Sequence, residues 1–362
     1  RGPPPDAAEL LAALLAQARR GPGRSAVRAT IDRVLRLALV GLDSSHADHY
    51  VRLVAAERRW PGVRLVALVD GEPGRRAELA AAGGLRLDAG DATVPDVVGR
   101  VDAAIVAPRA GRRHGAAPPA RPAAAAPALV DKPFAASVAD ARATLDVARA
   151  HGTAVTTASA LRFAPEVAAA RAALATADGG SVAPRVAAAP SSPTKPAASP
   201  PGPAVEVSGP ADPHDERDGL FFLGIHVVEA ARAVVGAPPG AAWSPPAVTR
   251  SADGIVATTR LGGVDVRLLL LDPGAHPTAG FAVAVRTPRG VERTEVVLDA
   301  DYLVPVVEHG LAVLAPGTTT TAPTAARTTA DPADDAGRVA AEHATILADL
   351  ALLAQVGAAL RP

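Results

Sequence analysis

Two short stretches of the sequence hold residue types that can bind a phosphate and polarise an oxygen. In VGLDSSHADHY, Val40–Tyr50, an apolar run reaches Gly41 and a helical pattern follows. A strand that ends in glycine before a helix directs backbone N–H groups and the positive end of the helix dipole at one point, which suits a phosphate. In ALVDKPF, Lys132 follows an apolar strand and precedes Pro133. An ammonium held there can hydrogen-bond a hydroxyl and stabilise charge developing on its oxygen.

We expect the first stretch to hold a dinucleotide, with backbone N–H groups from the turn around the pyrophosphate. Its candidate residues are Gly41, Leu42, Asp43, Ser44, Ser45 and His46. The usual fingerprint is GxGxxG, and only its first glycine is present, because Asp43 and His46 stand at the second and third positions. We expect these two side chains to point toward the nicotinamide end. The alternative is a plain strand-to-helix turn without a ligand.

Asp70 ends the second predicted strand, where an acid accepts hydrogen bonds from the adenosine ribose and disfavours a 2′-phosphate. This favours NAD over NADP. Two alternatives stay open: Asp70 caps the helix that starts at Pro73, or Arg75 or Arg76 receives a 2′-phosphate.

His226, near the start of a later helix, is the candidate general base, since its unperturbed pKa lies near working pH. The alternative is a core or capping histidine. Arg162 can clamp a substrate carboxylate or hydroxyls, or serve only in a structural ion pair. For Lys132 the alternative is a surface lysine after a strand. His214 and its acidic neighbours lack a fixed ligand spacing, so we expect a solvated charge cluster and no metal site.

The hydrophobic pattern predicts an α/β protein. Apolar runs at 36–42, 63–69, 85–87, 103–107, 127–130 and 153–157 alternate with helical stretches at 47–59, 73–82 and 137–151. Runs buried on both faces and separated by helices indicate a doubly wound parallel sheet of the Rossmann type. After a helix at 165–176, the Pro/Ser/Ala-rich stretch 187–213 predicts an extended loop.

A different pattern follows. One helix at 224–236 precedes alternating strands at 246–250, 254–260, 264–271, 280–287 and 292–298, which predict a mostly antiparallel sheet with a helix on one face. A low-complexity tract from Gly317 leads to a last helix at 336–359. The predicted division is a helical extension at 1–34 with a helix at 6–19, a Rossmann domain at 35–158, an α+β domain with an open-faced sheet at 159–315, and a linker with the C-terminal helix at 316–362.

The composition excludes several classes of protein. The 37 Lys and Arg residues balance the 37 Asp and Glu residues, so no bulk field attracts nucleic acid or anionic lipid. With no cysteine, the chain has no disulfide, thiolate metal site or cysteine nucleophile. The N-terminal apolar run LLAALLAQA is too short to span a bilayer and lacks a signal-peptide layout. We expect a cytoplasmic protein with no membrane and no nucleic-acid partner.

Several segments, in order, resemble the Gfo/Idh/MocA oxidoreductase family: LALVGLDSSH, VRLVALVD, the tripeptide DKP and GIHVVE. SALRFAPE and GLDSSH are similar to strings of an uncharacterised branch of that family. The resemblance covers roughly residues 35–310 and implies a Rossmann domain followed by an open-faced sheet domain. It gives Lys132 the place of the family's EKP lysine, with Asp131 for the glutamate. It also puts Pro108 and His114 in the loop that passes the nicotinamide.

The resemblance implies an NAD(P)-dependent dehydrogenase that transfers a hydride to or from a sugar, polyol or related hydroxy compound. Lys132 and His226 would be catalytic, and Arg162 and His114 would bind substrate. Members often have an Asp four residues before the histidine, where this chain has Phe222. Two rivals therefore stay open: a non-catalytic dinucleotide-binding regulator or scaffold, and an NAD-assisted elimination or hydrolysis. The family's pairing through its open sheet implies a homodimer or homotetramer.

Overall fold

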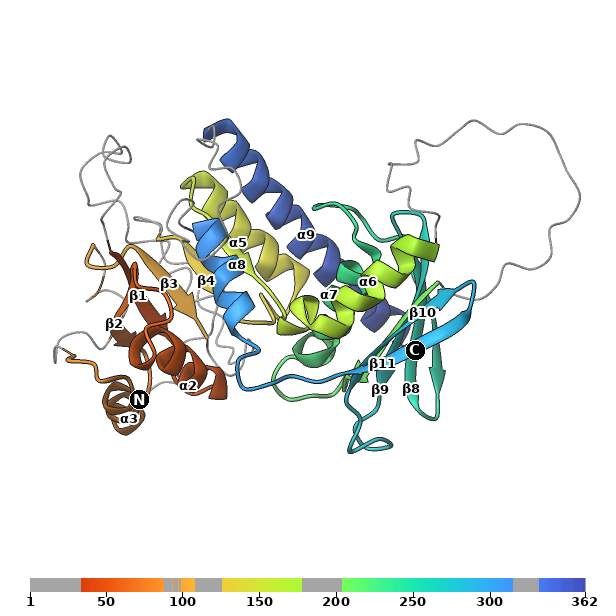
Figure 1. The fold of residues 1–362 in the computed structure, drawn as a ribbon, viewed down its shortest axis with the longest axis horizontal. Helices are drawn as coiled ribbons and strands as arrows, with labels where there is room; N and C mark the ends of the chain where they lie inside the picture. The colour runs from red at the N-terminus through yellow and green to blue at the C-terminus, as the bar shows by residue number, and fades with distance from the viewer. Residues whose placement is uncertain are drawn as a thin grey trace, which may run out of the picture.

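The computed structural model describes residues 34–87, 93, 97, 99–107, 126–177, 204–314 and 332–361. One sheet and its helices lie at one end of the molecule and a second sheet lies at the other, with α9 running between them (Figure 1). The predicted helix at 6–19, Pro108, His114 and most of the Pro/Ser/Ala-rich stretch lie outside the described residues.

The first sheet has five parallel strands in the order β2-β1-β3-β4-β5. The strands are β1 Leu35–Val40, β2 Val63–Val69, β3 Ala103–Val106, β4 Ala128–Val130 and β5 Val155–Thr157. The register aligns Val40 with Val106 and Val106 with Val130. Since parallel strands end at the same edge, the turn after β1 and the tripeptide after β4 lie at one edge of the sheet.

The helices of this sheet differ from expectation in two places. They are α2 Ser45–Val51, the π-helical turn η1 Arg52–Ala56, α3 Pro73–Gly83 and α5 Val138–Ala150. The helix expected at 47–59 starts two residues earlier and changes to π-helix after Val51. The strand expected at 85–87 is wrong. These residues follow the left-handed Gly84 that ends α3, and their two leucines pack on the core without a strand partner.

The second sheet has six strands in the order β11-β10-β6-β9-β8-β7. The strands are β6 Val205–Pro210, β7 Ala247–Ser251, β8 Gly254–Leu261, β9 Val264–Leu271, β10 Phe281–Thr287 and β11 Gly290–Val296. Only the pairing of β6 with β9 is parallel among these strands. The predicted fold class is confirmed. The extended loop is wrong where β6 forms, because Val205 and Val207 face the core in strand alternation at the end of the proline-rich stretch.

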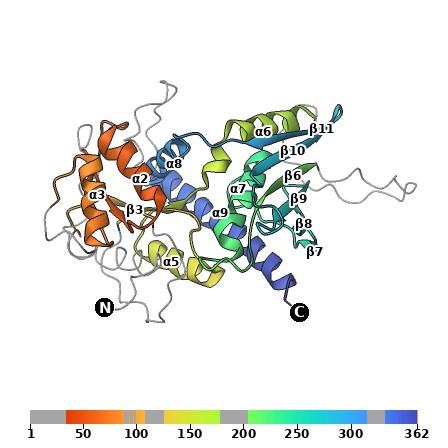
Figure 2. The same cartoon turned by 90° about the horizontal axis from the view of Figure 1, so that it is seen from below.

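Two helices, α6 Pro165–Ala177 and α7 Leu220–Val235, pack on one face of this sheet (Figure 2). The 3₁₀ turn η2 Ala160–Phe163 joins β5 to α6 and contacts α7. Helix α7 begins four residues before the expected start, and Gly236, with φ 67°, ends it in the left-handed conformation. This longer start puts Phe222 on the same helix as His226.

Two further helices connect the halves. Helix α8 Val304–Leu314, which the sequence analysis did not predict, packs on β4 and β5, and α9 Pro332–Ala359 packs on α5, β5 and α7. Among the described helices, α9 alone is long and apolar enough to cross a membrane. Its Asp349, however, is buried against Arg232 of α7 at 2.6 Å. Packing of this kind is typical of a core helix. The division into four segments stays a prediction.

Candidate active site

The turn after β1 has the geometry that a phosphate needs. Gly41 has φ 81°, a conformation that glycine adopts without a steric penalty. Ser44 is the N-cap of α2, yet its buried hydroxyl makes no capping bond and has no hydrogen-bond partner among the described residues. The first turn of a helix also leaves backbone N–H groups without intrahelical acceptors. An unpaired buried hydroxyl beside these donors fits a bound ligand such as a pyrophosphate.

The two side chains that replace fingerprint glycines take different directions. Asp43 is exposed. His46 turns away from the glycine turn, and its Nδ1 lies 2.6 Å from Oδ2 of Asp131 in the DKP tripeptide. Tyr50, one helical turn after His46, donates its hydroxyl proton to Oδ1 of Asp131 at 3.3 Å. The helix that follows the glycine turn is thus tied to the residue before Lys132.

Asp70 follows β2 with φ 52°, and Glu72 holds the N-cap position of α3. Arg75 donates from Nε to the carbonyl of Leu42 at 3.1 Å and pairs with Asp48. Arg76 donates from Nε to the carbonyl of Leu68 at 2.9 Å. Both guanidinium groups therefore have protein acceptors in this structure.

Lys132 lies against α7. Its Nζ is 4.4 Å from the ring centroid of Phe222, and Cζ of Arg217 is 3.7 Å from the same ring. A cation near an aromatic face is held by the ring quadrupole. Burial lowers the pKa of Lys132 below its ordinary value, while the charge of Asp131 acts in the opposite direction. Phe222 thus holds the ammonium beside α7, although it cannot accept a proton.

His226 is four residues after Phe222 on α7, so both residues face the same side of the helix. Its ring packs edge-on to Phe281 at 5.2 Å, and its Nδ1 lies 2.5 Å from Oγ of Ser159. Burial lowers the pKa of His226 well below its ordinary value, and the charges of Lys132 and His46 lower it further. The imidazole is therefore neutral at pH 7 and can accept a proton.

Asp218 comes just before α7, which starts at Leu220, and its side chain is buried. Its negative charge acts to raise the pKa of Lys132, against the larger effect of burial.

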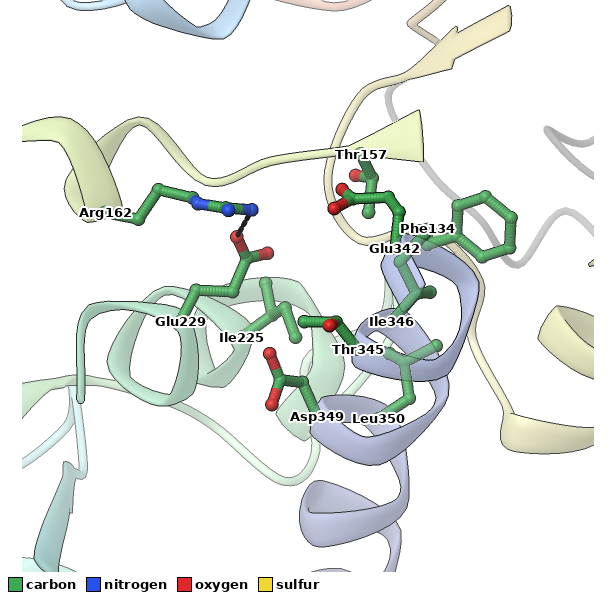
Figure 3. Close-up of a pocket in the computed structure, with 10 residues that line it drawn as sticks. All are labelled: Phe134, Thr157, Arg162, Ile225, Glu229, Glu342, Thr345, Ile346, Asp349 and Leu350. Atoms are coloured by element: carbon green, nitrogen blue, oxygen red, sulfur yellow. Dashed lines mark ion pairs between the residues drawn. The ribbon is translucent and has the colours of Figure 1, made fainter. Parts of the chain in front are cut away.

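Arg162 forms an ion pair, which is the structural one of the two roles predicted for it. Its Nη1 lies 3.7 Å from Oε2 of the buried Glu229, and both side chains border a cavity of about 10 Å³, room for one water molecule (Figure 3). Glu342 and Asp349 of α9 also line this cavity, whereas Lys132 and His226 do not. Burial raises the pKa of Glu229 from 4.5 to about 7, against the opposing charge of Arg162. A role for Arg162 in substrate binding stays a prediction.

The described residues contain no group of three or more side chains arranged to hold a metal ion. In the acidic group near His214, Asp215 accepts from Nη2 of Arg217 at 2.7 Å, so it balances a neighbouring charge. Ser159 is the site residue that the sequence analysis missed. The signal was available, because Ser159 follows the end of a parallel strand, where functional side chains of such sheets gather.

A family comparison agrees with these observations, which are a glycine turn, an acid after the second strand and a lysine at the shared strand edge. Residues 35–159 match the model of an oxidoreductase family with an NAD-binding Rossmann fold. The matching model is that of the Gfo/Idh/MocA family. The predicted resemblance is confirmed, and NAD is the cofactor of this domain, with NADP not excluded by the match. No curated protein matches the chain in sequence.

Several solved structures share the fold over about nine tenths of the chain. A putative myo-inositol dehydrogenase from Sinorhizobium meliloti is 16% identical with a TM-score of 0.54, covering 91% of this chain and 98% of that one. An Agrobacterium radiobacter oxidoreductase in complex with NAD+, L-tartaric acid and magnesium is 17% identical with a TM-score of 0.54, covering 90% and 97%. The Lactobacillus casei myo-inositol dehydrogenase with NAD(H) and myo-inositol is 13% identical with a TM-score of 0.53, covering 89% and 94%. At these identities the likeness concerns the fold.

Proposed function

We propose that this protein is an NAD-dependent dehydrogenase that interconverts a secondary alcohol and a ketone on a sugar, polyol or related hydroxy compound. The contact that carries the proposal is the one between Nζ of Lys132 and the ring of Phe222. It brings the lysine that follows a strand of the Rossmann sheet onto the face of α7 that bears His226. The ammonium can donate a hydrogen bond to the reacting oxygen and the neutral imidazole can accept the hydroxyl proton, which are two tasks in the oxidation of an alcohol by NAD.

In this mechanism NAD, when bound, supplies the nicotinamide that accepts the hydride from the substrate's C–H bond. Lys132 donates a hydrogen bond to the reacting oxygen and stabilises the negative charge that develops there. His226 takes the hydroxyl proton at Nε2, since its Nδ1 is engaged by Ser159. The lowered pKa of the imidazole keeps it unprotonated and ready to act at neutral pH. Both groups act in reverse when a ketone is reduced.

The cofactor preference in this proposal is for NAD. Asp70 stands where the adenosine ribose hydroxyls bind in Rossmann domains, and Arg75 is engaged with Leu42 and Asp48. A 2′-phosphate would meet the carboxylate and would have to compete for the arginine.

The assembly in this proposal is a cytoplasmic homodimer or homotetramer without a membrane or nucleic-acid partner. It rests on the family resemblance and on the balanced charge of the chain. Light scattering at micromolar concentration tests the assembly, and a monomer would contradict it.

The test is a screen of polyols, sugars and sugar acids with NAD+ at mildly alkaline pH, following absorbance of the reduced nicotinamide. We expect turnover with at least one compound and loss of turnover in Lys132→Met. Tight NAD binding without turnover on any compound would instead indicate a dinucleotide-binding regulator. Phe222, in the place of the usual acid, favours that alternative. Product formation without a net absorbance change would indicate NAD-assisted elimination or hydrolysis.

A further inference from the structure

His226 is held by a residue from the segment between β5 and α6. Its Nδ1 lies 2.5 Å from Oγ of Ser159, which comes directly before the 3₁₀ turn that follows β5. Ser159 has 0% exposure and His226 has 8%, so water does not compete for this contact. Phe222, one helical turn before His226, has no polar side-chain atom. The contact with Nδ1 of His226 is made by Ser159 instead.

Ser159 is itself fixed at two other points. Its backbone N–H donates to Oε2 of Glu229 at 2.9 Å, and its Oγ accepts from the backbone N–H of Leu161 at 3.2 Å. Glu229 lies three residues after His226 on α7, so the two side chains occupy one helix face. The same helix therefore supplies both the histidine and the carboxylate that anchors the serine.

The heavy-atom distance alone permits either direction of the hydrogen bond, and the chemistry distinguishes them. A serine oxygen has two acceptor sites, of which Leu161 uses one. A histidine that accepts the substrate's proton at Nε2 must carry its own proton on Nδ1 beforehand, and it carries both protons afterwards. In both of these states Nδ1–H donates to Oγ, so the contact need not rearrange during the reaction.

We propose that Ser159 is the positioning residue of His226: its Oγ accepts the Nδ1 proton and keeps Nε2 as the proton acceptor that faces the substrate. This inference rests on the proposed function for its catalytic meaning. Ser159 thereby supplies the orientation that an acid at position 222 would give, but without adding a further negative charge near Lys132. Glu229 supports Ser159 indirectly, because its carboxylate accepts a hydrogen bond from the backbone N–H of Ser159.

The tautomer of His226 tests the inference without a known substrate. The full chain is labelled with ¹⁵N-histidine, and the His226 signal is identified by its loss in His226→Asn. Long-range proton–nitrogen spectra at pH 7.5 are expected to show the proton on Nδ1 in the native protein, a shift toward the Nε2–H form in Ser159→Ala, and recovery in Ser159→Thr. Thr157→Val is the matched control, because Thr157 ends β5 two residues before Ser159 and its buried hydroxyl has no hydrogen-bond partner among the described residues.

Kinetics supply the second measurement, on any compound that the screen identifies. Ser159→Ala is expected to lower kcat on the order of 10- to 100-fold with little change in KM for NAD, and Ser159→Thr to restore it. An Nε2–H tautomer in the native protein, or an unchanged tautomer in Ser159→Ala, would overturn the inference even if another variant failed to fold. Absence of turnover together with the expected tautomers would refute the dehydrogenase and leave the positioning contact in place.

Discussion

Nδ1 of His46 lies 2.6 Å from Oδ2 of Asp131, which joins the helix after the glycine turn to the tripeptide that carries Lys132. The two residues belong to segments that follow β1 and β4, which β3 separates in the sheet. The contact directs the imidazole at the third fingerprint position to the tripeptide. In the proposed site, the backbone N–H groups of the turn then remain for the phosphate.

Replacement of His46 by alanine is expected to destabilise the protein by about 1–3 kcal/mol, because the buried Asp131 loses its nearest partner and keeps only Tyr50. Urea unfolding measures this loss. His49→Ala is the matched control on the same helix, since Nδ1 of His49 has no hydrogen-bond partner. Equal losses in the two variants would show that the contact with Asp131 contributes little.

Ser44→Ala separates cofactor binding from folding. The Ser44 hydroxyl makes no bond in the structure, so its removal is expected to leave the urea midpoint unchanged. The dissociation constant of NAD should rise about fivefold, which corresponds to one lost hydrogen bond of about 1 kcal/mol. Isothermal titration calorimetry measures the affinity. An unchanged affinity would remove Ser44 from the cofactor site.

Asp70→Ser is expected to shift the cofactor preference toward NADP by about tenfold, since it removes the charge that repels a 2′-phosphate. The dissociation constants of NAD and NADP for the native protein and the variant provide the ratio. If the native protein binds NADP as tightly as NAD, the assignment of Asp70 to the ribose is wrong.

Glu229 gives the stability of the protein a distinct pH dependence. Its pKa is raised to about 7 in the folded state, above 4.5 for the ordinary carboxyl, so the folded state binds the proton more tightly than the unfolded state. Its contribution to stability is therefore complete below pH 4.5 and is lost as pH rises to about 7, by about 3 kcal/mol. Glu229→Gln is expected to abolish this loss while keeping an acceptor for Ser159.

The measurement is the urea midpoint of the native protein and Glu229→Gln at pH 5 and pH 7.5. The second buried acid of the cavity, Glu342, serves as the comparison, because its hydrogen bond and ion pair with His309 lower its pKa to about 2 despite burial. Its stabilisation is present above pH 4.5 and disappears as pH falls toward 2, so the titration of the Glu342 carboxyl itself lies below the window between pH 5 and 7.5. A native-like pH dependence in Glu229→Gln would place the titrating group elsewhere.

The sequence predicted the features that depend on local pattern. The parallel strands, Gly41 and Lys132 at a shared edge, and the mostly antiparallel second sheet follow from apolar runs, glycine and proline positions, and strand alternation. Strand β6 was missed because a long proline-rich stretch precedes its short alternation of valines. Helix α8 was missed as well, although its residues are mostly apolar.

Contacts between distant segments could not be predicted in the same way. Phe222 was taken as the loss of an acid, whereas the fold places it against the ammonium of Lys132. The partner of His226 is Ser159, 67 positions away, and a small polar residue after a strand gives no sign of which helix will pack on it. Arg162 and Glu229 are paired for the same reason, since α7 crosses the segment that follows β5.

The central claim is that Lys132 and His226 act on the same substrate oxygen, and a double-mutant cycle in kcat/KM tests it most directly. With a compound found in the screen, the rate of nicotinamide reduction is measured for the native protein, Lys132→Met, His226→Gln and the double variant. Each single change is expected to cost at least about 100-fold, and the double variant to be little worse than the poorer single one, because the two groups work as a unit. Native-like turnover in either single variant, or losses that multiply in the double variant, would contradict the account.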